Sequence, residues 1–315
     1  MKLVQTLVVR DEADIVGDQI AYHLNAGVDF VVATDHLSVD GTTDILESYA
    51  REGVLRRISV TDEIMRDGPW RTHMARLAAT DYAADWVINT DADEFWMPRD
   101  ATLKETLASV PLGYGVVFAL SRHFVPRPDE DAWFAERMTV RVSPPVALHD
   151  PSSPYRPHLK AAHRADPRVT IGHGAHTASS GSLRALHHWH PADVLHFPFR
   201  SHEQWENKGV RRARGDSRLG QYVAALLAAE SGRSAARFRA LVVDDAALEQ
   251  GLSAGSLRVD TRLRDALLEP TEPPAAEPDQ TSVISDSVAA READIVRLRR
   301  YLDLMAERVA ALEDG

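Results

Sequence analysis

Short apolar runs alternate with amphipathic stretches through the first 120 residues of the chain. The runs have the length and composition of buried strands and lie at residues 3–9, 28–34, 54–60, 85–89 and 115–121. Between them, apolar residues recur at helical spacing and predict helices at 12–27, 42–52, 70–78 and 101–109. Strands separated by helices of this length are typical of βαβ units. We therefore predict an α/β fold with a mostly parallel sheet flanked by helices.

The alternation weakens after residue 121. Residues 122–200 are rich in Pro, His and Arg and hold short strand-like pieces such as 137–142. We predict irregular structure there, with antiparallel strands that complete the sheet. Residues 202–250 have a helical pattern and predict a C-terminal helical extension. Together these parts predict one domain over residues 1–260.

The C-terminal residues have a different character. Residues 261–282 are rich in Pro and Glu and predict a linker. In residues 283–315, apolar residues from Val288 to Leu312 follow alternating three- and four-residue steps, with a polar gap at Arg291. This spacing predicts either a coiled coil or an amphipathic helix docked on the domain. A coiled coil here would let the chain form a homo-oligomer.

The composition narrows the classes of partner and compartment. The chain is 44% hydrophobic, which is enough for a sizeable core, and its formal net charge of -11 argues against nucleic-acid binding. It has no cysteine, which excludes disulfides and thiolate zinc sites. It has no run of 18 apolar residues, and its opening segment is too quickly charged for a signal peptide. We therefore expect no transmembrane segment and a cytoplasmic protein.

Acidic residues follow the first four predicted strands. Open parallel sheets bind ligands at the carboxyl ends of their strands. The acidic residues at these ends are Asp11 and Glu12, Asp35 and Asp40, Asp62, and then Asp91, Asp93 and Glu94. Any one of them has a structural explanation, because Asp and Glu also cap helices and favour turns. Their recurrence at all four ends favours a ligand site.

The group after the fourth strand, in "VINTDADEFW", is the densest. In an extended segment alternate side chains share a face, so Asp91 and Asp93 should lie together while Glu94 points away. Two carboxylates aimed at one point repel each other unless a cation lies between them. A hard divalent ion with oxygen ligands, Mg²⁺ or Mn²⁺, is the simplest partner. We expect Glu94 to pair with Arg71 or Arg122 or to face an acceptor.

Four segments together resemble family-two-type glycosyltransferases with the GT-A fold, in the branch whose metal motif reads D-x-D-E-F. The first three are "TLVVRDEADIV", "ATDHLSVDGTTDIL" and "WVINTDADEF", and the fourth, "LHFPFRSHEQWENKG", is similar to that branch's H-Y-x-x-R-S followed by Lys. The resemblance covers about residues 1–210. It implies a nucleotide-binding half at about 1–120 and an acceptor half at about 121–210. The predicted helical part at 211–260 lies outside the resemblance.

The resemblance implies a nucleotide pocket built from the first two strand ends. Thr6, Arg10 and Glu12 would border the pocket of a nucleotide-sugar donor. Asp35 would hydrogen-bond the base, and Asp40 would lie in the loop beside it.

The resemblance also implies a metal and diphosphate site. Asp91 would lie near the ribose and the metal, Asp93 would bind the metal directly, and His196 would complete the metal site. A histidine ligand favours Mn²⁺ slightly over Mg²⁺. Arg200 and Lys208 would face the diphosphate, whose developing charge needs such cations.

The catalytic base is not marked by any motif. Asp193 ranks first because it precedes the expected metal ligand His196 by three residues, and Glu94 is the second candidate. Other candidates are Asp150 and the histidines at 173, 176 and 190. Phe95 is expected to pack in the core and Trp96 to line the pocket rim.

The function expected from these observations is metal-dependent transfer of a sugar from a nucleotide-diphosphate sugar to a hydroxyl acceptor, in glycan or polysaccharide synthesis. The resemblance favours inversion of configuration. The alternative is a non-catalytic nucleotide-sugar-binding or scaffold protein that assembles through its coiled coil. A sugar-phosphate nucleotidyltransferase is disfavoured, because that class needs a glycine-rich loop after the first strand and "VVRDEADIV" has none. The sugar, the base and the acceptor stay open.

Overall fold

The computed structural model describes residues 1–61, 65–99, 101–143, 153–155, 157–214 and 231–269. The predicted helix at 283–315, the part of the predicted linker after residue 269 and the base candidate Asp150 lie outside these residues. Homo-oligomer formation through the C-terminal helix therefore stays a prediction.

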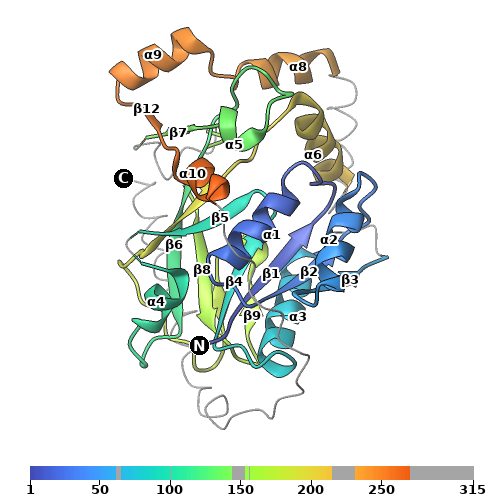
Figure 1. The fold of residues 1–315 in the computed structure, drawn as a ribbon, viewed down its shortest axis with the longest axis vertical. Coiled ribbons are helices and arrows are strands. Elements are labelled where there is room, and N and C mark those ends of the chain that lie inside the picture. The colour runs from blue at the N-terminus through green and yellow to red at the C-terminus, as the bar shows by residue number, and fades with distance from the viewer. Residues whose placement is uncertain (62–64, 100, 144–152, 156, 215–230, 270–315) are drawn as a thin grey trace, which may run out of the picture.

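The described residues form strands and helices that alternate at first and then become irregular (Figure 1). The strands are β1 (Leu3–Val9), β2 (Phe30–Asp35), β3 (Leu55–Ser59), β4 (Trp86–Asp91), β5 (Glu94–Pro98), β6 (Val116–His123), β7 (Val140–Val142), β8 (Leu159–Arg164), β9 (Thr170–Ile171), β10 (Ala178–Ser179), β11 (Ala192–His196) and β12 (Leu257–Val259). The helices are α1 (Val16–Asn25), α2 (Thr42–Arg51), α3 (Asp67–Thr80), α4 (Leu103–Ala108), α5 (Phe134–Arg137), the 3₁₀ turn η1 (His173–Ala175), α6 (His202–Arg214), α8 (Ser231–Arg239), α9 (Asp245–Ser253) and α10 (Arg262–Leu268).

Eight of these strands form the central sheet, in the order β3-β2-β1-β4-β8-β6-β11-β5. β1 to β4, β6 and β11 run in one direction, whereas β8 and β5 run in the other. The predicted α/β fold with a mostly parallel sheet flanked by helices is confirmed. The predicted antiparallel completion of the sheet is also confirmed, because β8 pairs antiparallel with both β4 and β6.

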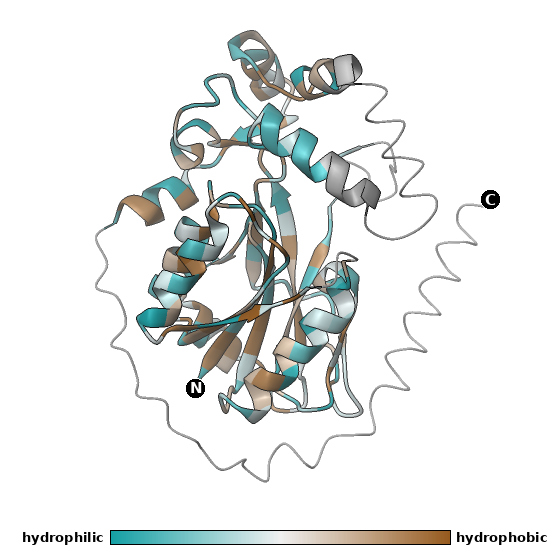
Figure 2. Cartoon of the chain, turned by 90° about the vertical axis from the view of Figure 1, so that its right-hand side faces the viewer, coloured by the Kyte–Doolittle hydropathy of each residue, from teal (hydrophilic) through white to brown (hydrophobic). Residues whose placement is uncertain are grey.

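The apolar runs become central strands because both faces of the sheet are covered. Along β1, Leu3 and Leu7 pack into the core beneath α1, α2 and α4, whereas Val4 and Val8 pack into the core beneath α3. Adjacent residues of a strand point to opposite faces, so a strand covered on both faces needs a continuous apolar run. Figure 2 shows the resulting brown interior of strands between helices that turn teal surfaces outward.

The strand directions gather the ends of distant segments at one edge of the sheet. Six strands have their carboxyl ends at this edge, and β5 begins there because it runs the opposite way. The register pairs His196 of β11 with His123 of β6 on one side and with Glu94 of β5 on the other. Residues 91–94, 123 and 196 therefore meet, although they lie far apart in the sequence.

The C-terminal part of the described chain folds back onto the domain. β12 pairs antiparallel with β7, and α10 follows with its Leu263 buried in the main core. The prediction of a linker at 261–282 is therefore wrong for residues 262–268, which form α10. The predicted helical region at 202–250 forms three separate helices in its described parts, and the first gap between them is not described. None of the helices in the described ranges has the length and apolarity needed to cross a bilayer.

Asp260 anchors this returning segment. Its carboxylate lies 2.7 Å from Nε of Arg141 on β7 and 2.8 Å from the guanidinium of Arg262, and its side chain is 5% exposed. Burial raises the pKa of Asp260, but hydrogen bonds and charges from Arg262 and Arg141 outweigh this and lower it to about 2.

We predict that Asp260→Asn lowers the free energy of unfolding at pH 7 by about 2 kcal/mol, because two arginines lose their counter-charge. A carboxylate with a depressed folded-state pKa stabilises the fold above its unfolded pKa of about 3.9. That contribution is lost as the pH falls toward 2. Urea unfolding should show the full difference at pH 7 and a shrinking difference below pH 4. Glu249→Gln, on the exposed surface of α9, is the control, and a pH-independent difference for Asp260→Asn would contradict the assignment.

Candidate functional site

Carboxylates gather where β4 turns into β5. Asp91 ends β4 and Glu94 begins β5, with a two-residue turn at 92–93 between them. The ammonium of Lys160 on β8 lies 2.9 Å from one oxygen of Asp91 and 2.7 Å from an oxygen of Glu94. Arg71 of α3 pairs with the other oxygen of Asp91. Lys160 and Arg71 are 4% and 1% exposed, so two buried cations neutralise this side of the turn.

The turn changes which carboxylates share a partner. The expectation that Glu94 points away from Asp91 is wrong, because both bind Lys160 and Glu94 Oε2 also accepts a hydrogen bond of 3.1 Å from the amide of Asp91. A turn interrupts the alternation that holds within a single strand. Phe95 packs in the core as expected, whereas Trp96 is 2% exposed and does not line a rim.

Asp93 projects from the tip of the turn into a second group of cations. Lys208 of α6 lies 2.5 Å from its Oδ2, and Arg200 lies 3.9 Å from the same oxygen. Nε2 of His196 lies 3.5 Å from Oδ1. The structure thus brings together Asp93, His196, Arg200 and Lys208, which the sequence placed in two segments about a hundred residues apart.

Arg200 connects this group to the loop after β1. Its guanidinium, which is 1% exposed, pairs with Glu12 and lies 2.6 Å from an oxygen of Asp14. Lys208 lies 3.2 Å from the other oxygen of Glu12. Glu12, Asp14 and Asp93 therefore share two cations, and we name these five residues, together with His196, the Asp93 cluster.

Asp40 holds the loop that presents Glu12. Its carboxylate accepts hydrogen bonds of 3.0 Å from the amide of Ala13 and 2.7 Å from the hydroxyl of Thr42. The same hydroxyl accepts a bond of 2.9 Å from the amide of Glu12. Asp40 thus supports the Asp93 cluster through the backbone and lies beside the predicted base-binding residue Asp35.

The charges set the protonation of the three carboxylates. Burial raises the pKa of Asp93, but the charges of Lys208, His196 and Arg200 outweigh it and hold that pKa well below its usual range. Burial likewise raises the pKa of Asp91, but the charges of Arg71 and Lys160 outweigh it and lower that pKa. The pKa of Glu94 is raised, because burial and the charge of Asp91 outweigh the attraction of Lys160. Asp91 and Asp93 are therefore held as anions.

The expected metal ligands lie at this turn. Nδ1 of His196 lies 3.0 Å from Nδ1 of His123, so Nε2 is the nitrogen turned toward Asp93. Within the described ranges, no three His, Asp or Glu side chains are close enough together to hold an ion. The donor types nevertheless fit Mn²⁺ or Mg²⁺, because Asp91 and Asp93 are anionic and Nε2 of His196 lies 3.5 Å from Asp93.

The remaining residues expected at the nucleotide lie apart from the Asp93 cluster. Thr6 is fully buried, and its hydroxyl donates a 2.7 Å hydrogen bond to Asn89. Asp35 accepts a hydrogen bond of 2.6 Å from Thr43 and lies 3.3 Å from Arg57. Arg10 is 27% exposed at the end of β1. Arg10 and Asp35 lie at the carboxyl edge of the sheet, whereas Thr6 is enclosed in the middle of β1, and the structure does not bring the three side chains into one group.

Asp193 lies away from the Asp93 cluster. It is three residues from His196 on β11, so it is about 10 Å along the strand and on the opposite face. Its carboxylate pairs with Arg122 at 2.9 Å, Arg99 at 3.1 Å and Arg262 at 3.2 Å. These partners outweigh burial and lower its pKa. Its role as the catalytic base stays a prediction.

Sequence reasoning did not assign a role to Lys160 or Asp14, and it offered Arg71 only as a candidate partner of Glu94. A buried lysine needs an anionic partner, but the three basic residues of "LKAAHR" conceal the burial of Lys160 in the sequence. Arg71 and Asp14 lie in segments already marked as facing the ligand edge. Their partners depend on the tertiary structure and could not be read from spacing.

Comparison with protein-family models gives one match. Residues 4–118, from β1 into β6, match the model of glycosyltransferase family 92. No curated protein is similar enough to match.

Solved structures with a similar arrangement of elements share little sequence identity with this chain. A structure of S. aureus TarS 1-349 has 15% identity over 71% of this chain and 70% of its own, with a TM-score of 0.37. Mannosyltransferase PcManGT from Pyrobaculum calidifontis, in complex with GDP-Man and Mn²⁺, has 16% identity over 85% of each chain, with a TM-score of 0.36. These TM-scores are too low to support an argument about function, so the assignment depends on the family match. By that match, the chain is a glycosyltransferase.

Proposed function

We propose that this glycosyltransferase transfers a sugar from a nucleoside-diphosphate sugar to a hydroxyl acceptor with the help of a divalent cation. The observation that carries the proposal is the Asp93 cluster, which holds anionic and cationic groups together at the carboxyl edge of the sheet. A departing nucleoside diphosphate needs positive charge around its phosphates. Arg200 and Lys208 supply that charge at the place where parallel sheets bind ligands.

The cation in this proposal is Mn²⁺ or Mg²⁺, and the residues that would hold it are Asp91, Asp93 and His196. When bound, such an ion stabilises negative charge on the phosphate oxygens of the leaving group. The similarity of residues 91–95 to the D-x-D-E-F motif of family-two-type enzymes supports this part of the proposal.

The chain's own residues have separate tasks in the proposed reaction. Arg200 and Lys208 would bind the diphosphate, because their positive groups already lie at the Asp93 oxygens. Lys160 would keep Asp91 fixed, since the same ammonium also binds Glu94 and the carbonyl oxygen of Gly174. Asp35 and Arg10 would border the nucleoside, with Asp35 as the partner of the base, whereas the buried Thr6 would act only through its hydrogen bond to Asn89.

The base that accepts the proton of the acceptor hydroxyl is proposed to be Glu94 rather than Asp193. Glu94 lies at the turn and shares Lys160 with Asp91, whereas Asp193 is held by three arginines farther along β11. A base must lie within hydrogen-bond reach of the proton it accepts. Inversion of configuration and a role in glycan or polysaccharide synthesis complete the proposal, and both are supported by the resemblance alone.

We predict that Asp93→Asn reduces metal-dependent hydrolysis of the nucleotide-sugar donor by at least about 100-fold, because it removes the anion around which the cation site is built. A screen of UDP- and GDP-sugars with Mn²⁺, with Mg²⁺ and with a chelator identifies the donor first. Asp85→Asn, which directly precedes β4 at the end away from the turn, is the matched control and should retain activity. Wild-type turnover in the presence of the chelator would contradict the metal proposal. Metal-dependent nucleotide binding without turnover by any donor would instead favour the non-catalytic alternative.

We predict that Glu94→Gln lowers kcat by at least about 100-fold, whereas Asp193→Asn lowers it by less than about threefold. The reason is that only Glu94 is placed at the turn. Steady-state kinetics with the identified donor measure both variants, and urea unfolding confirms that both are folded at the assay temperature. Loss of kcat in Asp193→Asn with normal turnover in Glu94→Gln would reverse the assignment.

A further inference from the structure

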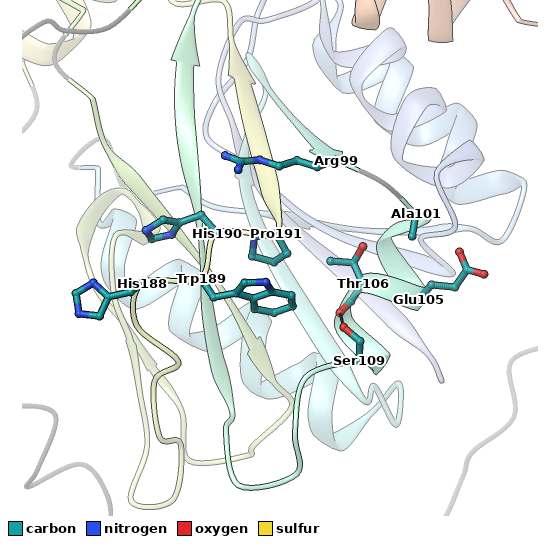
Figure 3. A pocket seen from close by; sticks show the side chains of 9 residues that line it. All are labelled: Arg99, Ala101, Glu105, Thr106, Ser109, His188, Trp189, His190 and Pro191. Carbon is teal, nitrogen blue, oxygen red and sulfur yellow. Dashed lines mark hydrogen bonds between the residues drawn. The ribbon is translucent and has the colours of Figure 1, made fainter.

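A pocket of about 500 Å³ lies at the opposite end of β5 and β11 from the Asp93 cluster. Its walls come from the residues after β5, from α4 and from the segment before β11 (Figure 3). The volume is within the range of small-molecule sites. The proposed reaction at the Asp93 cluster does not use this pocket.

The register of the edge strands fixes the separation between the two places. β11 pairs Ala192 with Pro98 at the pocket end and His196 with Glu94 at the cluster end. Five residues separate Pro191, which lines the pocket, from His196, which corresponds to about 16 Å along an extended strand. A ligand made of several linked units could therefore reach from one end to the other.

Trp189 gives the pocket its chemical character. It is 38% exposed, although it is one of the largest apolar side chains, and Figure 3 shows its indole between Pro191 and the side chains from α4. The preceding residue, His188, has a φ of 63°, in the left-handed region that non-glycine residues rarely adopt. Such backbone persists only where its surroundings hold it, and it is frequent at binding sites. An exposed indole face is a stacking surface for the C–H face of a sugar ring.

Hydrogen-bonding groups surround the indole. Thr106 and Ser109 contribute hydroxyls from α4 and its end. His190 lies on the other side, and its Nδ1 is 3.1 Å from the carbonyl oxygen of Phe118. A carbonyl oxygen only accepts, so Nδ1 carries the proton and Nε2 is an acceptor. The Ser109 hydroxyl donates a 2.7 Å hydrogen bond to the carbonyl oxygen of Thr106 and so offers its oxygen as an acceptor, whereas the Thr106 hydroxyl both donates and accepts. One such hydroxyl beside two acceptors matches the hydroxyl groups of a sugar.

The charges of the lining favour a neutral ligand over a phosphate. Arg99 lines the pocket, but its guanidinium already pairs with the carboxylate of Asp193 at 3.1 Å. Glu105 adds a negative charge from α4. A nucleoside diphosphate would face this carboxylate without a free arginine to bind it.

We propose that this pocket is a distal subsite for an oligosaccharide acceptor, in which one sugar ring stacks on Trp189 while the reacting end reaches the carboxyl edge of the sheet. This inference depends on the proposed function for the identity of its ligand as the acceptor. The acceptor is therefore a glycan of several units rather than a monosaccharide or a lipid alcohol.

Binding is tested on the full chain in the presence of a chelator and without nucleotide sugar, so that the donor site does not contribute. The probes are tetrasaccharides of glucose, mannose and N-acetylglucosamine, measured by calorimetry and saturation-transfer NMR. At least one should bind, and Trp189→Ala should weaken it about tenfold, whereas Trp189→Phe should keep most of the affinity. Ser109→Trp, which fills the pocket and keeps Trp189, should also abolish binding. Leu112→Ala, an exposed position outside the pocket, is the control.

Kinetics separate this proposal from the proposed function. Trp189→Ala should raise KM for the bound tetrasaccharide as acceptor about tenfold, with kcat and donor hydrolysis unchanged. Failure of all tetrasaccharides to bind, or equal binding by wild type, Trp189→Ala and Ser109→Trp, would overturn the subsite. Loss of donor hydrolysis in Asp93→Asn would still support the proposed function in that case, because the two measurements are independent.

Discussion

The buried ammonium of Lys160 is the contact on which the carboxyl edge of the sheet depends. It lies between Asp91 and Glu94, and all three side chains come from strands of the central sheet. Each buried ion costs several kcal/mol of lost hydration, which is offset only when a counter-ion and hydrogen bonds are close. Removing the lysine would leave two carboxylates facing each other without their shared cation. The antiparallel insertion of β8 between β4 and β6 is what brings this cation to the turn.

The same principle applies to Asp93, but its cations come from a different kind of element. Arg200 and Lys208 lie on the segment that follows β11 and in the first turns of α6, and both also pair with the loop after β1. Lys160 is enclosed in the sheet, whereas Lys208 is 23% exposed. Arg200 is as enclosed as Lys160, so the structure separates two fixed cations, which keep the carboxylates in place, from the more accessible Lys208.

The sequence predicted the parts of the fold that depend on local patterns. β1 to β4 were visible because strands covered on both faces need unbroken apolar runs, and the helices between them have amphipathic spacing. β8 and β5 were not visible, because "LKAAHR" carries three basic residues and "EFWMP" follows a charged turn. Their burial depends on partners such as Asp91 that only the tertiary structure supplies.

The sequence predicted most of the residues that form the candidate site, but it did not predict how their side chains are arranged. Asp93, His196, Arg200 and Lys208 carried motif signals and do meet, whereas the orientation of Glu94 was wrong because a two-residue turn breaks the alternation. Asp193 shows the same limit. Asp193 is only three residues from His196 in the sequence. In an extended strand this separation places the two side chains about 10 Å apart and on opposite faces.

Asp193 also helps to fix the distance between the two ends of the β5–β11 strand pair. Its carboxylate binds Arg99 after β5, Arg122 on β6 and Arg262 at the start of α10, and Arg262 continues to Asp260 and Arg141. This ion-pair network joins the edge strand, the interior of the sheet and the returning C-terminal segment between the Asp93 cluster and the Trp189 pocket. Strands connected in this way cannot slide past one another without breaking several buried or half-buried pairs. A rigid separation is what an acceptor of defined length would require, since a sugar ring held on Trp189 then fixes which hydroxyl reaches the carboxyl edge.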